Sequence, residues 1–153
     1  MSNELQGEQI GELRLPAEFS GPLVVEARKS VPHEVCGLIV GRREANRVWV
    51  TRTISCGNTA PPRTRETQFA IDPRRLIEEE RSLRNSEDEI VGFYHSHPAS
   101  DPIPSILDRT YMALWPDAIW VIVGVEVEMV GGAIRAWILD LADGKSVREV
   151  QVV

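Results

Sequence analysis

Two histidines and one aspartate stand at a spacing that can bind a metal ion. His95 and His97 are one residue apart in an apolar run, and alternate side chains of an extended strand point to the same face. Both imidazoles can therefore reach one ion. Asp108 follows after ten residues that include three prolines, which favour a stiff loop leading into a helix. Such a loop can bring Asp108 back toward the histidines.

Three protein ligands indicate a catalytic zinc site. Catalytic zinc usually has three protein ligands and an exchangeable water, whereas structural zinc has four protein ligands. The ion lowers the pKa of its water to about 7 and polarises a carbonyl oxygen. Peptide hydrolysis also needs a group that accepts a proton from water and gives one to the departing amine. Glu34, an acidic residue that opens an otherwise apolar run, is the candidate for this role.

Two or three helices are expected to position these residues. Helices are predicted over residues 20–30, 73–84 and 105–115. Their apolar stripes are formed by Phe19, Leu23, Ala27 and Val31, by Leu76, Ile77 and Leu83, and by Leu107, Tyr111 and Leu114. Pro22 marks either the start of the first helix, with Ser20 as its cap, or a kink within it. Asp72 caps the second helix, and Pro116 ends the third.

The remaining periodic segments predict strands, which lie over residues 9–15, 34–41, 47–55, 68–71, 89–95, 118–125, 133–140 and 146–152. The first is a short edge strand, and the uniformly apolar segment 118–125 lies centrally. Short turns join 34–41 to 47–55 and 133–140 to 146–152 as hairpins. We therefore predict an α/β fold: a mixed sheet of about six to eight strands with two or three helices packed on it. The domain spans residues 12–153 and follows a flexible N-terminus over residues 1–11.

Composition excludes several classes of function. A net charge of −6 argues against nucleic-acid binding, which normally requires a basic surface. No apolar run approaches the length of about 20 residues that spans a bilayer, and the first residues lack the pattern of a signal peptide. A cytoplasmic location without membrane contact is predicted. Cys36 and Cys56 lack CxxC spacing and are interpreted as buried thiols.

Taken together, Glu34, His95-x-His97-Pro98 and Ser105-x-x-Asp108 resemble the JAMM (MPN+) motif of metallopeptidases. The resemblance implies a single-domain MPN-like fold, related to that of cytidine deaminases, over about residues 12–150. It also implies that His95, His97 and Asp108 hold one zinc ion per chain. In addition, it implies that Glu34 is the general acid/base and that Ser105 donates a hydrogen bond to the oxyanion. By itself, Ser105-x-x-Asp108 is also a helix cap with an acid in the first turn, and the two roles are compatible.

The compact chain is similar to small prokaryotic JAMM peptidases, several of which act on ubiquitin-like sulfur-carrier proteins with a Gly-Gly tail. They release an amino acid such as cysteine, or a short peptide. A diglycine tail can add to a sheet edge and fit a narrow channel. The segment 67–73 is similar to the family's edge strand, so Phe69, Arg63 and Arg65 are predicted to contact the tail or the carrier. Packing of Phe69 and solvent exposure of the arginines are the alternatives.

Two other functions stay open at this point. The first is hydrolysis of another amide, in a cell-wall peptide or a ubiquitin-like conjugate. The second is a noncatalytic MPN scaffold, although such scaffolds usually lack one or more of the metal ligands. The oligomeric state is also open, with a homodimer among the options.

Overall fold

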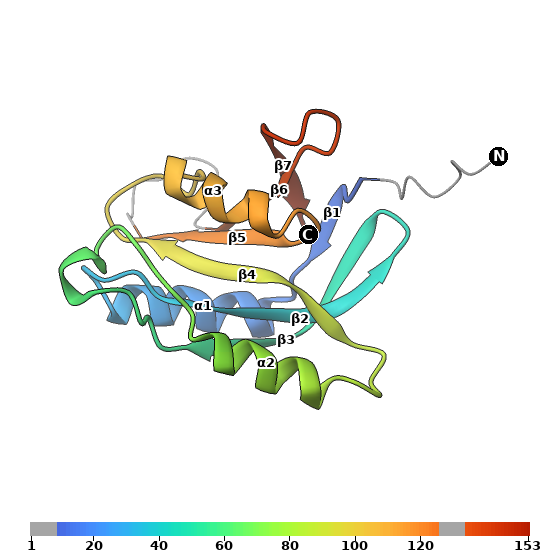
Figure 1. Cartoon of the computed structure of the whole chain (residues 1–153), viewed down its shortest axis with the longest axis horizontal. Helices are drawn as coiled ribbons and strands as arrows, with labels where there is room; N and C mark the ends of the chain where they lie inside the picture. The colour runs from blue at the N-terminus through green and yellow to red at the C-terminus, as the bar shows by residue number, and fades with distance from the viewer. Residues whose placement is uncertain (1–8, 126–133) are drawn as a thin grey trace.

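The computed structural model describes residues 9–125 and 134–153 and has an α/β architecture (Figure 1). Within these residues the strands are β1 (Glu12–Arg14), β2 (Cys36–Glu44), β3 (Arg47–Cys56), β4 (Glu89–His97), β5 (Ile119–Gly124), β6 (Ile134–Leu139) and β7 (Val147–Val152). The helices are α1 (Ala17–Lys29), α2 (Pro73–Ser82) and α3 (Ile106–Leu114), with a 3-10 turn, η1, at Pro62–Thr64. The predicted α/β class, with a mixed sheet and three flanking helices, is confirmed.

The sheet is closed into a barrel with the strand order β1-β3-β2-β4-β5-β6-β7. Strand β1 pairs in parallel with both β3 and β7, so the first and last strands of this order are neighbours and the sheet closes. The prediction of an edge strand in this region is therefore wrong, because the backbone of β1 has partners on both sides. The hairpins β2–β3 and β6–β7 are antiparallel, as predicted. Strand β5 lies between β4 and β6, in the central position predicted for it.

Side chains alternate between two hydrophobic cores on opposite faces of the sheet. On β5, residues 119, 121 and 123 belong to the core that α1 covers through Leu23 and Ala27. Residues 120 and 122 belong to the second core, which includes Met112 of α3 and Phe69. This division follows from the two-residue period of a strand. It places α1 and α3 on opposite sides of β4 and β5 (Figure 1).

Helix α1 begins earlier than predicted, at Ala17, and holds Pro22 in its interior. Pro16 precedes the helix and no side chain caps it, so Ser20 is not its cap. A proline this close to the first turn removes one helical hydrogen bond, which the burial of Leu23 and Ala27 outweighs. Val31 lies beyond the end of the helix and is 48% exposed.

Two other predicted features are wrong. The segment 68–71 is not a strand, because its backbone bonds to the loop residues Asn58 and Thr59 and not to another strand. In α3 the buried face is formed by Asp108 and Met112, one turn apart, so Leu114 points outward and is 69% exposed. Helix α2 is capped by Asp72, as predicted, and its Ile77 is exposed.

The predicted flexible N-terminus falls largely in residues 1–8, which lie outside the described residues, as does Ala133 of the predicted strand 133–140. The domain limit at residue 12 stays a prediction. Cys36 and Cys56 are free and buried, which confirms their interpretation as thiols. Over residues 9–125 and 134–153, none of the helices has the length and apolar character that a membrane crossing requires.

Candidate metal centre

The two histidines lie at the end of β4, a strand that is bonded on both sides. His95 pairs with Cys36 of β2 in the antiparallel direction and with Ile122 of β5 in the parallel direction. His95 is fully buried and His97 is nearly so. Their Nε2 atoms are 3.2 Å apart, because residues i and i+2 of a strand share a face.

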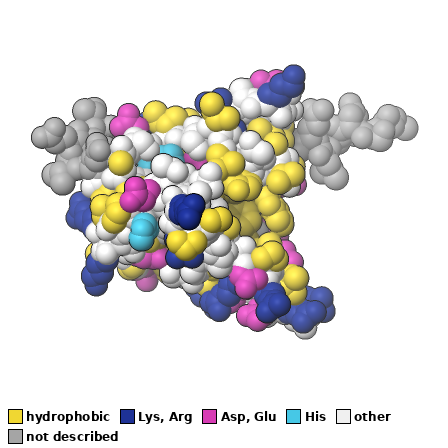
Figure 2. All heavy atoms as spheres, turned by 60° about the vertical axis from the view of Figure 1, so that its left-hand side comes forward, with side chains coloured by type: hydrophobic (Ala, Val, Ile, Leu, Met, Phe, Trp, Pro, Cys, Tyr) yellow, Lys and Arg dark blue, Asp and Glu magenta, His cyan; other side chains and the backbone are white. Residues whose placement is uncertain are grey.

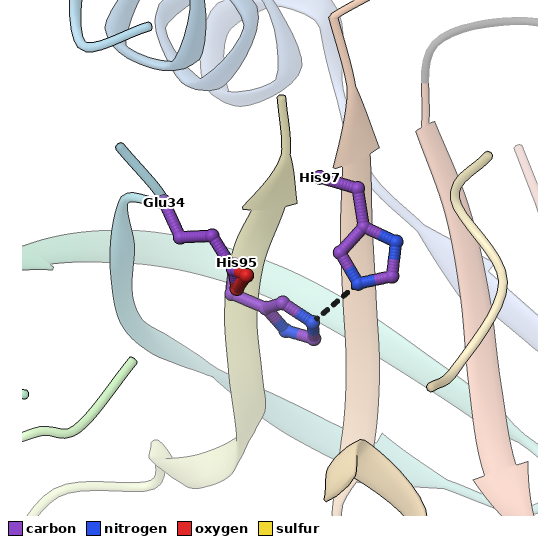
Figure 3. Close-up of side chains that lie close together, drawn as sticks. All are labelled: Glu34, His95 and His97. Carbon is purple, nitrogen blue, oxygen red and sulfur yellow. Dashed lines mark hydrogen bonds between the residues drawn. The ribbon is translucent and has the colours of Figure 1, made fainter. Parts of the chain in front are cut away.

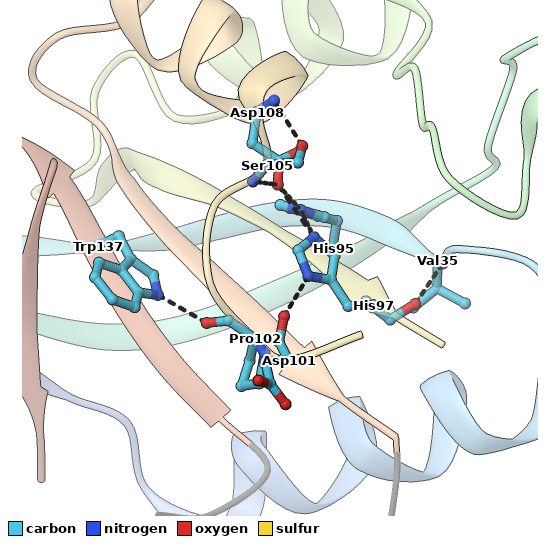
Figure 4. Close-up of polar contacts among 9 residues, drawn as sticks. Val35, His95, His97, Asp101, Pro102, Ser105, Asp108 and Trp137 are labelled. Atoms are coloured by element: carbon cyan, nitrogen blue, oxygen red, sulfur yellow. Dashed lines mark hydrogen bonds and ion pairs between the residues drawn. The ribbon is translucent and has the colours of Figure 1, made fainter. Parts of the chain in front are cut away.

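Asp108 reaches the same point from the first turn of α3. Its Oδ2 atom lies 3.1 Å from the Nε2 atoms of both His95 and His97 (Figure 4). The same oxygen accepts a hydrogen bond from the backbone N–H of Ser105 at 2.9 Å. The Ser105 hydroxyl in turn accepts from the Asp108 N–H at 3.0 Å, which completes a capping box. The helix cap therefore fixes the direction in which the Asp108 carboxylate points.

These three atoms match the ligand geometry of a tetrahedral metal ion. Ligand atoms about 2.0–2.1 Å from a tetrahedral zinc lie about 3.3 Å from one another. The Nδ1 atom of His97 lies 2.7 Å from the backbone oxygen of Asp101, which can only accept, so the proton is on Nδ1. Nε2 of the neutral His97 ring then offers a lone pair to the centre. The site thus directs two nitrogens and a carboxylate oxygen at one point.

The loop between His97 and α3 is fixed by its backbone carbonyl groups. Besides the bond from His97 to Asp101, the indole Nε1 of Trp137 on β6 donates to the carbonyl of Pro102 at 2.9 Å (Figure 4). The barrel strands β4 and β6 therefore hold the loop from two sides. This explains how the sequence-predicted stiff loop brings Asp108 to the histidines.

Glu34 lies two residues before β2, and its side chain reaches toward the His95 ring (Figure 3). One ligand atom from each of Glu34, His95 and His97 lies within 4.8 Å of the others, and all three residues are buried, so this group can hold a metal ion. The backbone N–H of Glu34 donates to the carbonyl of Arg65 at 2.7 Å. The structure thus brings Glu34, His95, His97, Asp108 and Ser105 together, as the sequence predicted.

Burial and charge shift the pKa values of these groups in opposite directions. Loss of solvent raises the pKa of Glu34 to about 8, with Asp108 adding to the rise and His97 opposing it. Burial also acts to raise the pKa of Asp108, but the contacts of its carboxylate with both imidazole rings and the hydrogen bond from the Ser105 N–H outweigh it and hold that pKa well below its usual range. Asp108 is therefore a carboxylate, and Glu34 is the group that can carry a proton near neutral pH.

The predicted substrate contacts lie around the centre at different depths. Phe69 is buried, and its ring stacks on that of His95 with 4.5 Å between centroids. Arg65 is half-buried and its Nε donates to the carbonyl of Ala60 at 2.8 Å, whereas Arg63 is exposed. Their contacts with a substrate stay a prediction.

Phe69 also lines an apolar cavity of about 320 Å³. It lies between α2 and α3, and its walls include Leu76, Tyr111, Trp115 and Trp120. Figure 2 shows hydrophobic side chains gathered on one face of the molecule, with charged side chains around them. An apolar surface thus accompanies a polar, buried centre.

Sequence reasoning missed two residues that support the site, Ser96 and Asn58. The Ser96 hydroxyl accepts from the Val35 N–H at 2.8 Å, and its own N–H donates to the Val35 carbonyl at 3.0 Å, which ties the Glu34 segment to β4. Ser96 lies between His95 and His97, and alternate side chains of a strand point to opposite faces. A small polar residue facing away from the two ligands was therefore the signal that the sequence offered. Asn58 has no such signal, because three of its four partners, Glu34, Gln68 and Ala70, lie ten or more residues away in the sequence.

A closed α/β barrel that carries a glutamate beside a His-His-Asp cluster defines the class of JAMM-type peptidases, as the motif predicted. The model of the family described as prokaryotic homologs of the JAB domain matches residues 16–140. The chain belongs to this family.

Named relatives agree with this assignment. The chain is 34% identical to a desampylase of Haloferax volcanii over 72% of its own length and 78% of the relative. It is 27% identical to the CysO-cysteine peptidase of Mycobacterium bovis, over 72% of each chain. The solution structure of protein DSY2949 from Desulfitobacterium hafniense is similar with a TM-score of 0.76 and 25% identity, over 92% of this chain and 91% of that one. The protein is therefore an enzyme of the JAMM peptidase type.

Proposed function

We propose that this protein is a zinc peptidase that hydrolyses the amide bond after the C-terminal Gly-Gly of a ubiquitin-like sulfur-carrier protein. It releases an amino acid such as cysteine, or a short peptide. The observation that carries the proposal is the convergence of Glu34 with His95, His97 and Asp108 in one buried centre. The names of the relatives, desampylase and CysO-cysteine peptidase, support a small ubiquitin-like protein as the substrate.

In this proposal His95, His97 and Asp108 hold one zinc ion per chain. Two imidazoles and a carboxylate are a usual ligand set for catalytic zinc, with a further position left for water. When bound, the zinc supplies a water of pKa about 7 and polarises the scissile carbonyl. The hydrogen bond from His97 Nδ1 to Asp101 keeps the ring turned toward the ion.

Glu34 moves the protons of the reaction. Its carboxylate accepts a proton from the attacking water and donates it to the departing amine, so one side chain serves both steps. Burial raises the pKa of Glu34 to about 8, and a cation nearby lowers it again, which leaves the group able to act as base and as acid near neutral pH.

Ser105 stabilises the oxygen that becomes negative when water attacks. The Ser105 oxygen accepts from the Asp108 N–H, and a hydroxyl has one donor besides its two lone pairs. Its O–H hydrogen is therefore available for the substrate oxygen. The helix cap holds the hydroxyl at the edge of the centre, so no reorganisation is needed during the reaction.

The segment 68–71 is the proposed docking edge for the substrate tail. Asn58 and Thr59 bond to the backbone of Gln68 and Ala70 on one side of this segment. The peptide groups of an extended chain alternate, so those of Phe69 point the other way, where a tail can pair with them. Glycine suits the last positions of the tail because it leaves room between this segment and the metal centre. Arg63 and Arg65 are proposed to contact the tail or the carrier.

The proposal also covers the partner, the location and the domain limits. The net charge of −6 favours a protein partner over nucleic acid. A cytoplasmic location and a domain over residues 12–153 are proposed as well, and both agree with the composition. The homodimer stays an open option.

The test uses a ubiquitin-like carrier fused through its Gly-Gly tail to cysteine, with an Ala-Ala tail as the matched control. We expect zinc-loaded protein to release cysteine from the Gly-Gly fusion only, and a chelator to stop the release. Glu34→Gln should keep about one zinc per chain and lose activity by about 10²-fold or more. Cleavage that survives full zinc removal, or cleavage of a cell-wall peptide in place of both fusions, would contradict the proposal.

A further inference from the structure

The side chain of Asn58 joins three separate parts of the site region. It lies in the loop after β3, where its Nδ2 donates to the backbone carbonyls of Glu34 at 3.1 Å and Gln68 at 3.0 Å. Its Oδ1 accepts from the N–H groups of Ala60 at 3.0 Å and Ala70 at 3.2 Å. A side-chain amide has two N–H donors and two oxygen lone pairs. All four are used.

The partners of Asn58 carry the groups on which the reaction depends. Glu34 is the proton carrier, and its backbone carbonyl is held by Asn58. The peptide groups on both sides of Phe69, through Gln68 and Ala70, are held by the same amide. Phe69 in turn stacks on His95 at 4.5 Å. One amide thus sets the position of Glu34 relative to the segment that packs against a metal ligand.

We propose that Asn58 is a positioning residue of the peptidase, which keeps Glu34 and the docking segment 68–71 in a fixed relation to each other. The inference rests on the proposed function, in which Glu34 carries protons and the segment 68–71 binds the substrate tail. A displacement of about 1 Å at a reacting group costs about 10²-fold in rate, so a mobile Glu34 carboxylate lowers kcat. Asn58 touches neither substrate nor metal in this scheme and acts only through its partners.

Two substitutions separate the donated from the accepted bonds. Asn58→Asp keeps oxygens that can accept from Ala60 and Ala70, but it cannot donate to the carbonyls of Glu34 and Gln68. Asn58→Ala removes all four bonds. Asn85→Asp is the matched control, since it makes the same change at an exposed residue in the turn between α2 and β4.

With the Gly-Gly fusion, we expect Asn58→Asp and Asn58→Ala to lower kcat by about 10- to 100-fold while zinc content and the folded fraction stay unchanged. Asn85→Asp should stay within about twofold of the unmodified protein. The inference is overturned when kcat of Asn58→Asp is within about twofold of the original, or when its loss matches the loss of folded, zinc-loaded protein. If Asn58→Ala does not fold, Asn58→Asp alone decides.

A structural measurement decides the inference without activity. Crystal structures of the zinc-loaded original and Asn58→Asp proteins should show the Glu34 carboxylate displaced relative to His95 and His97 in the variant. An unmoved carboxylate overturns the inference. The crystal structures also separate the proposed function from the role of Asn58. If the original protein does not cleave the Gly-Gly fusion, the proposed function is refuted, but the position of the Glu34 carboxylate in the two structures still tests the role of Asn58.

Discussion

At the scale of single residues, the Ser105 hydroxyl has an observed structural role and a proposed catalytic one. It caps α3 by accepting from the Asp108 N–H, and its own hydrogen is free to donate. Ser105→Ala should therefore lower kcat by about 10²- to 10³-fold, as expected for the loss of one oxyanion donor. The capping loss alone is about 1 kcal/mol of unfolding free energy. Steady-state kinetics and urea denaturation of the same preparation measure both effects.

The Ser105→Thr variant is the control for this prediction, since threonine also caps helices and keeps a hydroxyl. We expect it to retain most of the activity that Ser105→Ala loses. If Ser105→Ala loses only the activity that its reduced folded fraction explains, Ser105 is a helix cap and no more.

The candidate site could be predicted from sequence to the extent that its residues are close in the chain. His95 and His97 share a strand face, and Ser105 and Asp108 share a helix turn, so local periodicity places each pair. Glu34 was a candidate because it is an acid that opens an apolar run, and the resemblance to a known motif supported its place beside them. Asn58 was not predictable, because three of its four bonds depend on how the start of β2, the loop after β3 and the segment 68–70 fold against each other.

At the scale of elements, Ser96 holds the start of β2 against β4. Its hydroxyl is the acceptor for the buried Val35 N–H at 2.8 Å, one residue from Glu34. Ser96→Ala leaves that N–H without this partner, which should cost about 1–3 kcal/mol of unfolding free energy. Urea denaturation measures the loss. Ser82→Ala, which removes an exposed hydroxyl at the end of α2, should stay within about 0.5 kcal/mol, and equal losses in both variants would contradict this role of Ser96.

The hairpin between β6 and β7 is fixed by the Asp143 carboxylate. Hydrogen bonds from the Ser146 hydroxyl and from the N–H groups of Lys145 and Ser146 lower the pKa of Asp143 to about 2. Because the folded-state pKa is depressed, its contribution to stability is present above the unfolded value of about 3.9 and is lost as the pH falls through about 2. NMR titration of the Asp143 carboxyl carbon measures this pKa. Ser146→Ala should raise it, and a value near 3.9 in the original protein would refute the turn geometry.

Helices and strands were predicted correctly where the hydrophobic pattern was long. They were predicted wrongly where tertiary contacts determine the local backbone structure. The hairpins and the central strand β5 have alternating or continuous apolar runs, which the sequence displays directly. The short segment 68–71 has the composition of a strand, but Asn58 and Thr59 satisfy its backbone in place of a neighbouring strand. Likewise, the early start of α1 depends on packing against β5, which outweighs the unfavourable Pro22.

At the scale of the whole molecule, closure of the barrel depends on one of its shortest strands. β1 has three residues, yet it pairs with β3 on one side and with β7 on the other. Closure was not predictable from sequence, because a short strand near a terminus gives no sign of having two partners. The consequence is that β1 and β7, near the two ends of the chain, stabilise each other.

Leu13 tests this closure, because it is the fully buried residue at the middle of β1. Leu13→Ala should lower the unfolding free energy by about 2–5 kcal/mol, as expected for a large-to-small change in a core that cannot collapse around the cavity. Val25→Ala on the exposed face of α1 is the control and should change it by less than about 0.5 kcal/mol. Urea denaturation followed by tryptophan fluorescence measures both. A loss below about 1 kcal/mol for Leu13→Ala would contradict this role of β1. Only a partly exposed or mobile strand loses so little unfolding free energy when its central leucine is truncated, so the barrel would not depend on β1 for its stability.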